Sequence, residues 1–407
     1  MRGISSFERG VMENAADASM LARTEKWAGV NSGSRNLPGL ATMAAMLADA
    51  FSGLPGAISL VDPDPVEAVR PDGRLDLIAH GSHLRLSVRP QAPVQILLTG
   101  HMDTVFPADH AFQTLRWIDP ATLNGPGVAD MKGGLAVMLA ALSAFETAPG
   151  TERLGYDVII NSDEEVGSPS SAALLRQVAA GKLAAFTYEP ALPDGTLAGA
   201  RAGSGNFAII VTGKSAHAGR NPQDGRNALL AAADLALRLK AGSNTGLSCN
   251  PARIEGGSPN NVVPDHAVLH VNFRPKTPAD EQAADILLKD AMAQVARNHD
   301  VTLHRHGGFG RPPKPMDSQA EALFRLVQQC GADLSLPIAW RDTGGVCDGN
   351  NIAACGVPVV DTMGVRGGDI HSDSEYLIVD SLAERAQLSA LALLRIAEGR
   401  FTKGMKA

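Results

Sequence analysis

The chain has 407 residues, of which 44% are hydrophobic and 19% are charged, and this composition is typical of a folded globular protein rather than a disordered or fibrous one. Its net charge of −7 argues against nucleic acid or an anionic membrane as the main partner, because a phosphate-rich surface attracts a basic face. The length predicts two or three domains.

The cysteines indicate neither a disulfide framework nor a thiolate zinc site. They are scattered at Cys249, Cys330, Cys347 and Cys355, without a CxxC pair. The first ten residues lack the apolar core of a signal peptide, and no apolar run reaches membrane-spanning length. We therefore predict a cytoplasmic protein.

The first part of the chain alternates predicted helices with short apolar strands. The predicted elements are a helix over 36–53 and strands over 75–79, 84–88 and 94–100. The last of these runs is bounded by proline and glycine, as a strand buried on both faces requires. It places His101 and Asp103 just past its end.

Further ligand-type residues follow the next predicted elements. Asp130 precedes an apolar helix over 131–147, and a strand over 157–161 runs into Asp163-Glu164-Glu165. Strands over 184–188 and 357–361 precede Glu189 and the loop that contains His371. Because ligands of open α/β sheets bind beyond the strand ends, we expect these side chains to lie close together.

Each of these residues has a simpler interpretation when it is taken alone. The three acids could form a solvated turn, His101 a polar strand cap, Asp130 a helix cap and Glu189 a surface acid. Together, two histidines and three carboxylates exceed what one tetrahedral zinc ion needs. They suit two ions that share a bridging carboxylate. Nitrogen and oxygen ligands without thiolate fit zinc, cobalt or manganese.

The middle of the chain has a different pattern. The predicted elements are strands over 205–212, 247–256, 266–274 and 301–306, with helices over 224–241 and 278–298. The order β-α-β-β-α-β is that of a ferredoxin-like unit. We therefore predict an inserted domain over 204–312 and a discontinuous catalytic domain over 1–203 and 313–407.

Five motifs together resemble the aminoacylase and carboxypeptidase family of dinuclear zinc metallopeptidases, most closely its glutamate carboxypeptidase branch. They are Gly100-His101-Met102-Asp103-Thr104-Val105, Gly127-Val128-Ala129-Asp130-Met131-Lys132-Gly133-Gly134, Asp163-Glu164-Glu165-Val166-Gly167-Ser168, Ser215-Ala216-His217-Ala218-Gly219 and His371-Ser372. The resemblance covers nearly the whole chain. It implies an α/β zinc-peptidase-like catalytic domain, with a mixed sheet and helices on both faces, and an inserted ferredoxin-like lid through which two copies dimerise.

The resemblance also implies a role for each ligand-type residue. His101 and Glu189 would hold one divalent ion, Glu165 and His371 the other, and Asp130 would bridge both. Asp103 would orient the ligand histidine, and Glu164 would be the general base. Zinc is the metal that the resemblance implies. The peptide bond after Asp130 is expected to be cis.

Substrate contacts are implied by the same resemblance. His217 would reach the partner's active site in a homodimer, although a turn histidine is the simpler interpretation of its motif. Arg274 and Asn261 match positions that hold the substrate's C-terminal carboxylate, for which the guanidinium fork is well suited. Arg311 resembles a second such arginine, or is a solvated hinge residue. Gly345 is a further predicted substrate contact, with Gly344 and Arg201 as weaker ones.

We therefore predict a dinuclear metal-dependent amide hydrolase, a carboxypeptidase that releases a C-terminal amino acid such as glutamate. One alternative is an N-acyl-amino-acid or acetylornithine-type deacylase. Another is a non-catalytic, metal-binding dimer that recognises a peptide or amino-acid conjugate, and the presence of Glu164 argues against it because a binding protein needs no base. Two departures from the family pattern, Cys347 and the terminal motif over 371–375, leave the fine specificity open.

Overall fold

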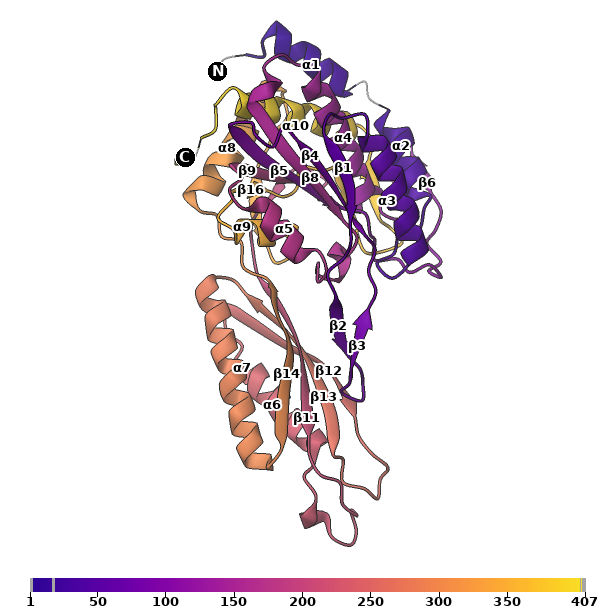
Figure 1. The fold of residues 1–407 in the computed structure, drawn as a ribbon, viewed down its shortest axis with the longest axis vertical. Coiled ribbons are helices and arrows are strands. Elements are labelled where there is room, and N and C mark those ends of the chain that lie inside the picture. Colours follow the sequence, from indigo (N-terminus) through magenta and orange to yellow (C-terminus); the bar gives the residue numbers. More distant parts are fainter. Residues whose placement is uncertain (1–2, 17–18, 403, 405–407) are drawn as a thin grey trace.

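The computed structural model describes residues 3–16, 19–402 and 404. Figure 1 shows two bodies, an upper one built from the beginning and end of the chain and a lower one built from the middle. The chain passes down into the lower body before β11 and returns after β14. This arrangement agrees with the predicted catalytic body and inserted lid.

A six-stranded mixed sheet forms the centre of the upper body. Its order is β1 (Ala57–Val61), β4 (His83–Val88), β8 (Leu154–Asn161), β5 (Val94–His101), β9 (Ala184–Thr187) and β16 (Val359–Val360). The strands from β8 to β16 are parallel to one another, whereas β1 and β4 are antiparallel to their neighbours. The three buried strands β8, β5 and β9 therefore end at one edge of the sheet.

Helices cover both faces of this sheet, as predicted. They are α1 (Ser6–Ala16), α2 (Met20–Ala28), α3 (Leu37–Phe51), α4 (Gly133–Glu146), α5 (Ala172–Ala179), α8 (Ser318–Asp333), α9 (Asp348–Ala353) and α10 (Ser381–Ala397). Side chains alternate along a strand, so Ile96 and Leu98 join the core under α4 and α10, while Leu97 joins the core under α5 and α9. Both faces of β5 are thus buried.

The lid is an antiparallel sheet with two helices on one face (Figure 1). Its elements are β11 (Ser204–Thr212), α6 (Ala228–Ala241), β12 (Leu247–Gly256), β13 (His266–Pro275), α7 (Pro278–His299) and β14 (Thr302–Arg311). The β-α-β-β-α-β order is the predicted one. Helix α6 begins later than predicted because the side chain of Asn227 caps it by accepting a hydrogen bond from Leu230 N.

Several smaller elements were not predicted. They are β2 (Val66–Val69), which forms a ribbon with the predicted strand β3 (Leu75–Ile78), the pair β10 (Leu197–Arg201) and β15 (Trp340–Thr343), and the sheet of β6 (Arg116–Asp119), β7 (Thr122–Asn124), β17 (Gly367–Gly368) and β18 (Tyr376–Ile378). The ribbon reaches the lid, where His266 Nε2 lies 3.0 Å from the carbonyl oxygen of Pro71. The predicted strand 75–79 is therefore part of a connection between the two bodies.

The start of α4 differs from the prediction of a helix from Met131. A short irregular turn, Val128–Lys132, precedes the regular helix, and its backbone leaves helical angles at Asp130 and Met131. The peptide bond between these two residues is cis, as the family resemblance implied. Among the described residues, the helical segment Val128–Glu146 is the one long and apolar enough to cross a membrane, but 94% of its most apolar stretch is buried in the fold, as in a core helix.

A close approach of α4 to the sheet sets the position of the residues that follow β9. A Cβ atom on Gly134 would lie 2.0 Å from the backbone oxygen of Tyr188, the residue before Glu189. We expect Gly134→Ala to lower the free energy of unfolding by about 1–3 kcal/mol, because the helix must move away from the strand. Denaturant unfolding measures this change. Gly53→Ala is the control, since a Cβ at Gly53 meets nothing within 4 Å, and equal stability of the two variants would contradict the interpretation.

Candidate active site

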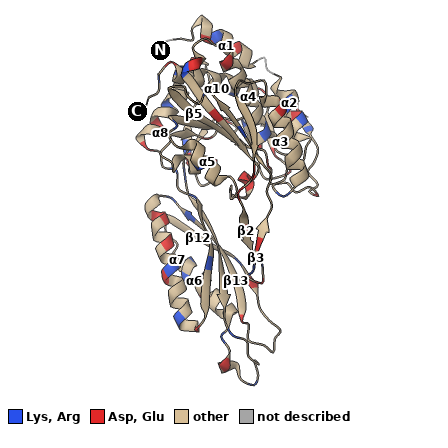
Figure 2. Ribbon diagram, in the orientation of Figure 1, with Lys and Arg blue, Asp and Glu red and all other residues tan. Residues whose placement is uncertain are grey.

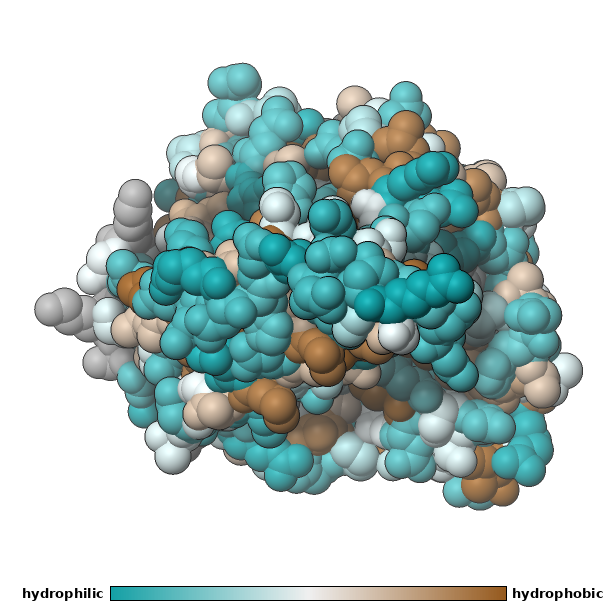
Figure 3. Space-filling view, turned by 90° about the horizontal axis from the view of Figure 1, so that it is seen from below, coloured by the Kyte–Doolittle hydropathy of each residue, from teal (hydrophilic) through white to brown (hydrophobic). Residues whose placement is uncertain are grey.

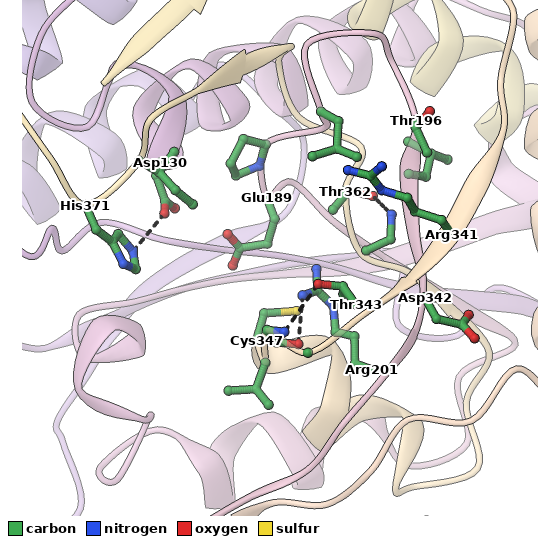
Figure 4. A pocket seen from close by; sticks show the side chains of 18 of the residues that line it. Asp130, Glu189, Thr196, Arg201, Arg341, Asp342, Thr343, Cys347, Thr362 and His371 are labelled. Atoms are coloured by element: carbon green, nitrogen blue, oxygen red, sulfur yellow. Dashed lines mark hydrogen bonds and ion pairs between the residues drawn. The ribbon is translucent and has the colours of Figure 1, made fainter. Parts of the chain in front are cut away.

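Five ligand-type side chains meet beyond the ends of β5, β8 and β9. His101 Nε2 lies 3.0 Å from Asp130 Oδ1 and 3.8 Å from Glu189 Oε2. On the other side, His371 Nε2 lies 3.3 Å from Asp130 Oδ2 and 3.1 Å from Glu165 Oε2. Each carboxylate oxygen of Asp130 therefore faces a different histidine, which is the arrangement that a bridging ligand needs. Figure 4 shows His371, Asp130 and Glu189 around this end of the pocket.

The donor atoms are close enough to hold metal ions. Two groups, His101 with Asp130 and Glu165, and His101 with Glu164 and Glu189, each bring one ligand atom per residue within 4.8 Å of the others. Glu189 Oε1 is buried and has no hydrogen-bond partner among the described residues. A buried carboxylate oxygen without a donor is unfavourable, and a cation would satisfy it. These residues therefore fit divalent ions.

The pKa shifts of residues in the cluster also bear on metal binding. Burial raises the pKa of Glu164 to about 7, although Arg311 opposes the shift. Hydrogen bonds to Asp130 and Glu165 raise the pKa of His371 to about 11. A metal ion binds the neutral imidazole, so it competes with this proton. We therefore expect metal affinity to fall as the pH is lowered.

Asp103 organises the turn that carries both active-site glutamates. Its Oδ1 accepts a hydrogen bond from Glu164 N at 3.1 Å, and its Oδ2 accepts one from Glu165 N at 3.2 Å and one from Ser34 Oγ at 2.7 Å. His101 Nδ1 lies 2.9 Å from the backbone oxygen of Asp103 and 3.4 Å from its Oδ1. Asp103 thus contacts His101 and also holds the backbone of the two glutamates.

The three successive acids have three different surroundings. Asp163 turns into the protein, where its carboxylate accepts hydrogen bonds from Ser170 and Ser171 at 2.6–2.8 Å. Glu165 faces His371, and Glu164 lines the pocket. The acidic turn is therefore not a solvated surface loop.

Arg311, at the end of β14, is buried against Glu164. Its Nη2 lies 2.6 Å from Glu164 Oε1 and donates to the backbone oxygen of Glu164 at 2.8 Å and to Ser168 Oγ at 2.9 Å. With 5% of its surface exposed, Arg311 is not a solvated hinge arginine. Its predicted contact with substrate stays a prediction, because its guanidinium binds Glu164 in this structure.

A cavity of about 560 Å³ adjoins the cluster and contains further predicted residues. Gly344, Gly345, Arg201 and Cys347 line it together with the acids. Arg201 is bound to Asp361 at 2.7 Å and donates to the backbone oxygen of Gly345 at 3.2 Å. Burial raises the pKa of the Cys347 thiol well above its usual range, so this side chain is a neutral thiol.

Three predicted residues do not reach this cavity within one chain. His217 and Asn261 lie in lid loops, where Asn261 O accepts a hydrogen bond from Ala218 N at 2.9 Å and His217 Nδ1 accepts one from Gly219 N at 3.1 Å. Arg274 lies at the end of β13 and donates to Asn272 Oδ1 at 2.9 Å. None of the three lines the cavity, and their roles stay predictions.

Glu375 is an organising residue to which the sequence analysis assigned no role. Its buried carboxylate accepts hydrogen bonds from the backbone nitrogens of Gly127, Ala129 and Asp130 at 3.0–3.1 Å. It thereby fixes the backbone at Asp130, the residue predicted to bridge two ions. The available signal was an acid four residues after His371, but no spacing rule links it to a loop that lies more than 240 residues earlier.

Residues 97–395 match the family described as Peptidase family M20/M25/M40. The chain belongs to this family. The predicted resemblance to dinuclear metallopeptidases is confirmed at this level, and so is the prediction of a metallohydrolase, which leaves the non-catalytic alternative without support. Carboxypeptidase G2 from Pseudomonas sp. (strain RS-16) is 28% identical over 333 residues, which cover 79% of this chain and 78% of that protein. Succinyl-diaminopimelate desuccinylase from Psychrobacter arcticus is 29% identical over 321 residues, 72% and 76% of the two chains.

Solved structures share the fold of this M20 family chain. A tripeptidase from Staphylococcus aureus has a TM-score of 0.71 at 22% identity, with 93% of this chain and 97% of that chain covered. Bacillus subtilis YxeP, described as a dinuclear metal binding peptidase from the M20 family, has a TM-score of 0.63 at 15% identity, with 93% and 98% covered. The expected α/β fold with a lid is therefore confirmed.

The role of Glu375 can be tested by removing its charge. We expect Glu375→Gln to lower metal affinity by about 10–100-fold, because an amide NH₂ would face backbone N–H donors and displace Asp130. Titration against a competing chelator measures the affinity, with circular dichroism to verify the fold. Asp373→Asn is the matched control, since Asp373 is exposed in the same loop. An unchanged affinity in folded Glu375→Gln would rule out this positioning role.

Proposed function

We propose that this M20 family member is a carboxypeptidase that hydrolyses the last amide bond of a small peptide or conjugate and releases a C-terminal amino acid, with glutamate as the first residue to test. The observation that supports catalysis is the division of labour between adjacent glutamates. Glu165 faces His371, while Glu164 faces the cavity and Arg311. The name of one relative, carboxypeptidase G2, supports the choice of reaction.

The residues that would hold two divalent ions are His101, Asp130, Glu165, Glu189 and His371. We propose zinc, and the same donor set also suits cobalt or manganese. Ions bound there would supply Lewis acidity toward the carbonyl group and favour ionisation of water near neutral pH.

Glu164 is proposed as the group that moves protons. Its carboxylate accepts a proton from the attacking water as the water oxygen bonds to the carbonyl carbon, and it delivers that proton to the leaving nitrogen as the C–N bond breaks. This role commonly contributes 10²–10⁴-fold, as an order of magnitude. Asp103 holds the Glu164 backbone, and Arg311 holds its carboxylate.

The predicted lid residues complete the proposal if two copies dimerise through the lid, residues 204–312. His217 of one subunit would then donate to the developing oxyanion in the other, and Arg274 and Asn261 would hold the released residue's carboxylate. This requires a lid surface that another copy can cover.

Two exposed leucines support the lid helix α6 as part of that surface. Leu230 is 60% exposed and Leu237 is 72% exposed. The two residues lie two turns apart on the same face of the helix. In contrast, Figure 2 shows charges of both signs along α7. Figure 3, which views the molecule from the lid end, shows a largely hydrophilic face with separate hydrophobic patches.

A deacylase acting on an N-acyl amino acid, of the acetylornithine type or another, is the alternative. It would use the same ligands and base, and the desuccinylase relatives of similar identity favour it. To decide between the two, the rates of hydrolysis are compared for peptides that end in glutamate and for N-acetylornithine and other N-acyl amino acids.

The general base can be separated from the metal ligands by two matched variants. We expect Glu164→Gln to keep both metal ions and lose at least 10²-fold in kcat, because the proton acceptor is removed while the ligands remain. Glu165→Gln should instead lose metal, because it removes a ligand. Metal analysis and turnover on the preferred substrate measure both effects, and near-wild-type activity of metal-loaded Glu164→Gln would contradict the assignment.

The proposed action of His217 across the dimer can be tested by mixing inactive subunits. A dimer of one His217→Ala subunit and one Glu164→Gln subunit contains one intact site, so random mixing should restore about a quarter of wild-type activity. Each variant alone should stay nearly inactive. Absence of rescue in mixed dimers verified by mass spectrometry would exclude the cross-subunit role.

A further inference from the structure

An arginine lies at the end of the active-site cavity that is opposite the histidines and carboxylates described above. Arg341 lines the same cavity as Asp130, Glu189 and His371. In Figure 4, Arg341 and Thr196 lie on one side of the pocket, while His371 and Asp130 lie on the other. The end of the cavity opposite these side chains therefore contains the exposed guanidinium of Arg341, with the exposed carboxylate of Asp342 on the same side.

Strand geometry directs Arg341 into the cavity. In β15, the preceding Trp340 turns to the core, where its ring packs on Phe324 with centroids 5.2 Å apart. Because successive side chains of a strand point to opposite faces, Arg341 points the other way. Its partner in β10 is Ala198, which also lines the cavity and is too small to block it.

The guanidinium of Arg341 makes no hydrogen bond or close ion pair in the part of the chain that the structure describes, although its charge contributes to lowering the pKa of the Asp194 carboxyl. The other two arginines at the site are engaged, Arg201 with Asp361 and Arg311 with Glu164. The acids near Arg341 are Asp342 and Asp194, and their carboxylates accept hydrogen bonds from the backbone nitrogens of residues 200 and 196. Neither lies within ion-pair distance of Arg341.

The cavity wall has both polar and apolar parts. Arg201, Thr343 and Thr362 contribute to the polar part, and the apolar part consists of Pro190, Leu192, Leu197 and Ala198. A ligand that spans the cavity therefore places a short aliphatic segment along the apolar part of this wall. An anionic group beyond that segment would meet Arg341, which can hold a carboxylate through two parallel hydrogen bonds.

We infer that Arg341 is a specificity-determining residue that binds a carboxylate on the acyl side of the substrate. This rests on the proposed function, in which the lid residues hold the carboxylate of the released amino acid, so that the cavity in the catalytic body accommodates the acyl group. The preferred substrates are then amides of aliphatic dicarboxylic acids, or peptides with an acidic residue before the scissile bond. A neutral acyl group would leave Arg341 in water.

The test compares two acyl groups of the same chain length, N-glutaryl-L-glutamate and N-pentanoyl-L-glutamate. We expect the wild-type enzyme to prefer the glutaryl compound by about 10–100-fold in kcat/KM, mainly through KM, because one charge-assisted pair is gained. Arg341→Gln should remove this preference by weakening only the glutaryl reaction, and Arg341→Lys should keep part of it. Arg297→Gln, an exposed arginine on α7, is the control that should keep the full preference.

Binding of the same two compounds to metal-loaded Glu164→Gln gives a readout that does not need turnover. Calorimetry should show the same preference, lost in the Arg341→Gln double variant. Equal affinity of the two acyl compounds, or an equal loss for both in Arg341→Gln, would overturn the role of Arg341. Failure of hydrolysis with the binding preference intact would instead count against the proposed reaction.

Discussion

The buried negative charge at the end of the central sheet is the constraint on which the rest of the site depends. Asp130, Glu164, Glu165 and Glu189 lie together where burial penalises every ionised carboxylate. Histidines pair with some of them, but Glu189 retains a buried oxygen without a donor. Carboxylates this close together are stable only when protons or cations compensate their negative charge. The cluster is therefore suited to bind metal ions.

Residues around the cluster hold this arrangement in position. Asp103 accepts hydrogen bonds from the backbone of the acidic turn. Glu375 accepts hydrogen bonds from the backbone nitrogens of Gly127, Ala129 and Asp130. Gly134 lets α4 approach the backbone of Tyr188, the residue before Glu189. These contacts orient the ligand-type side chains through hydrogen bonds and packing within the protein itself.

The lid connects to the same centre through Arg311. This residue ends the last lid strand, and its guanidinium binds the carboxylate of Glu164. A change in lid position would therefore act directly on the proposed base. The β2–β3 ribbon makes a second connection at His266, so the two bodies touch at more than the hinge.

Much of this protein could be predicted from local pattern. The apolar runs 94–100 and 157–161 predicted strands, because burial on both faces requires continuous apolar sequence. The polar residues that follow these runs were then predicted to lie at the strand ends. The six lid elements followed from the change in periodicity. The parallel alignment of β5, β8 and β9 then explains why His101, Glu165 and Glu189 meet at one edge.

Other features depend on contacts between distant segments, which no local pattern contains. Glu375 reaches residues 127–130 because β18 pairs with β7, and Arg311 reaches Glu164 because β14 ends beside the acidic turn. Arg341 faces the cavity because Trp340 is drawn into the core. The sequence by itself determined the ligand types, the order of elements and the family. Only the tertiary structure decided which charges are paired and which remain free, because burial and distance exist only once the chain has folded.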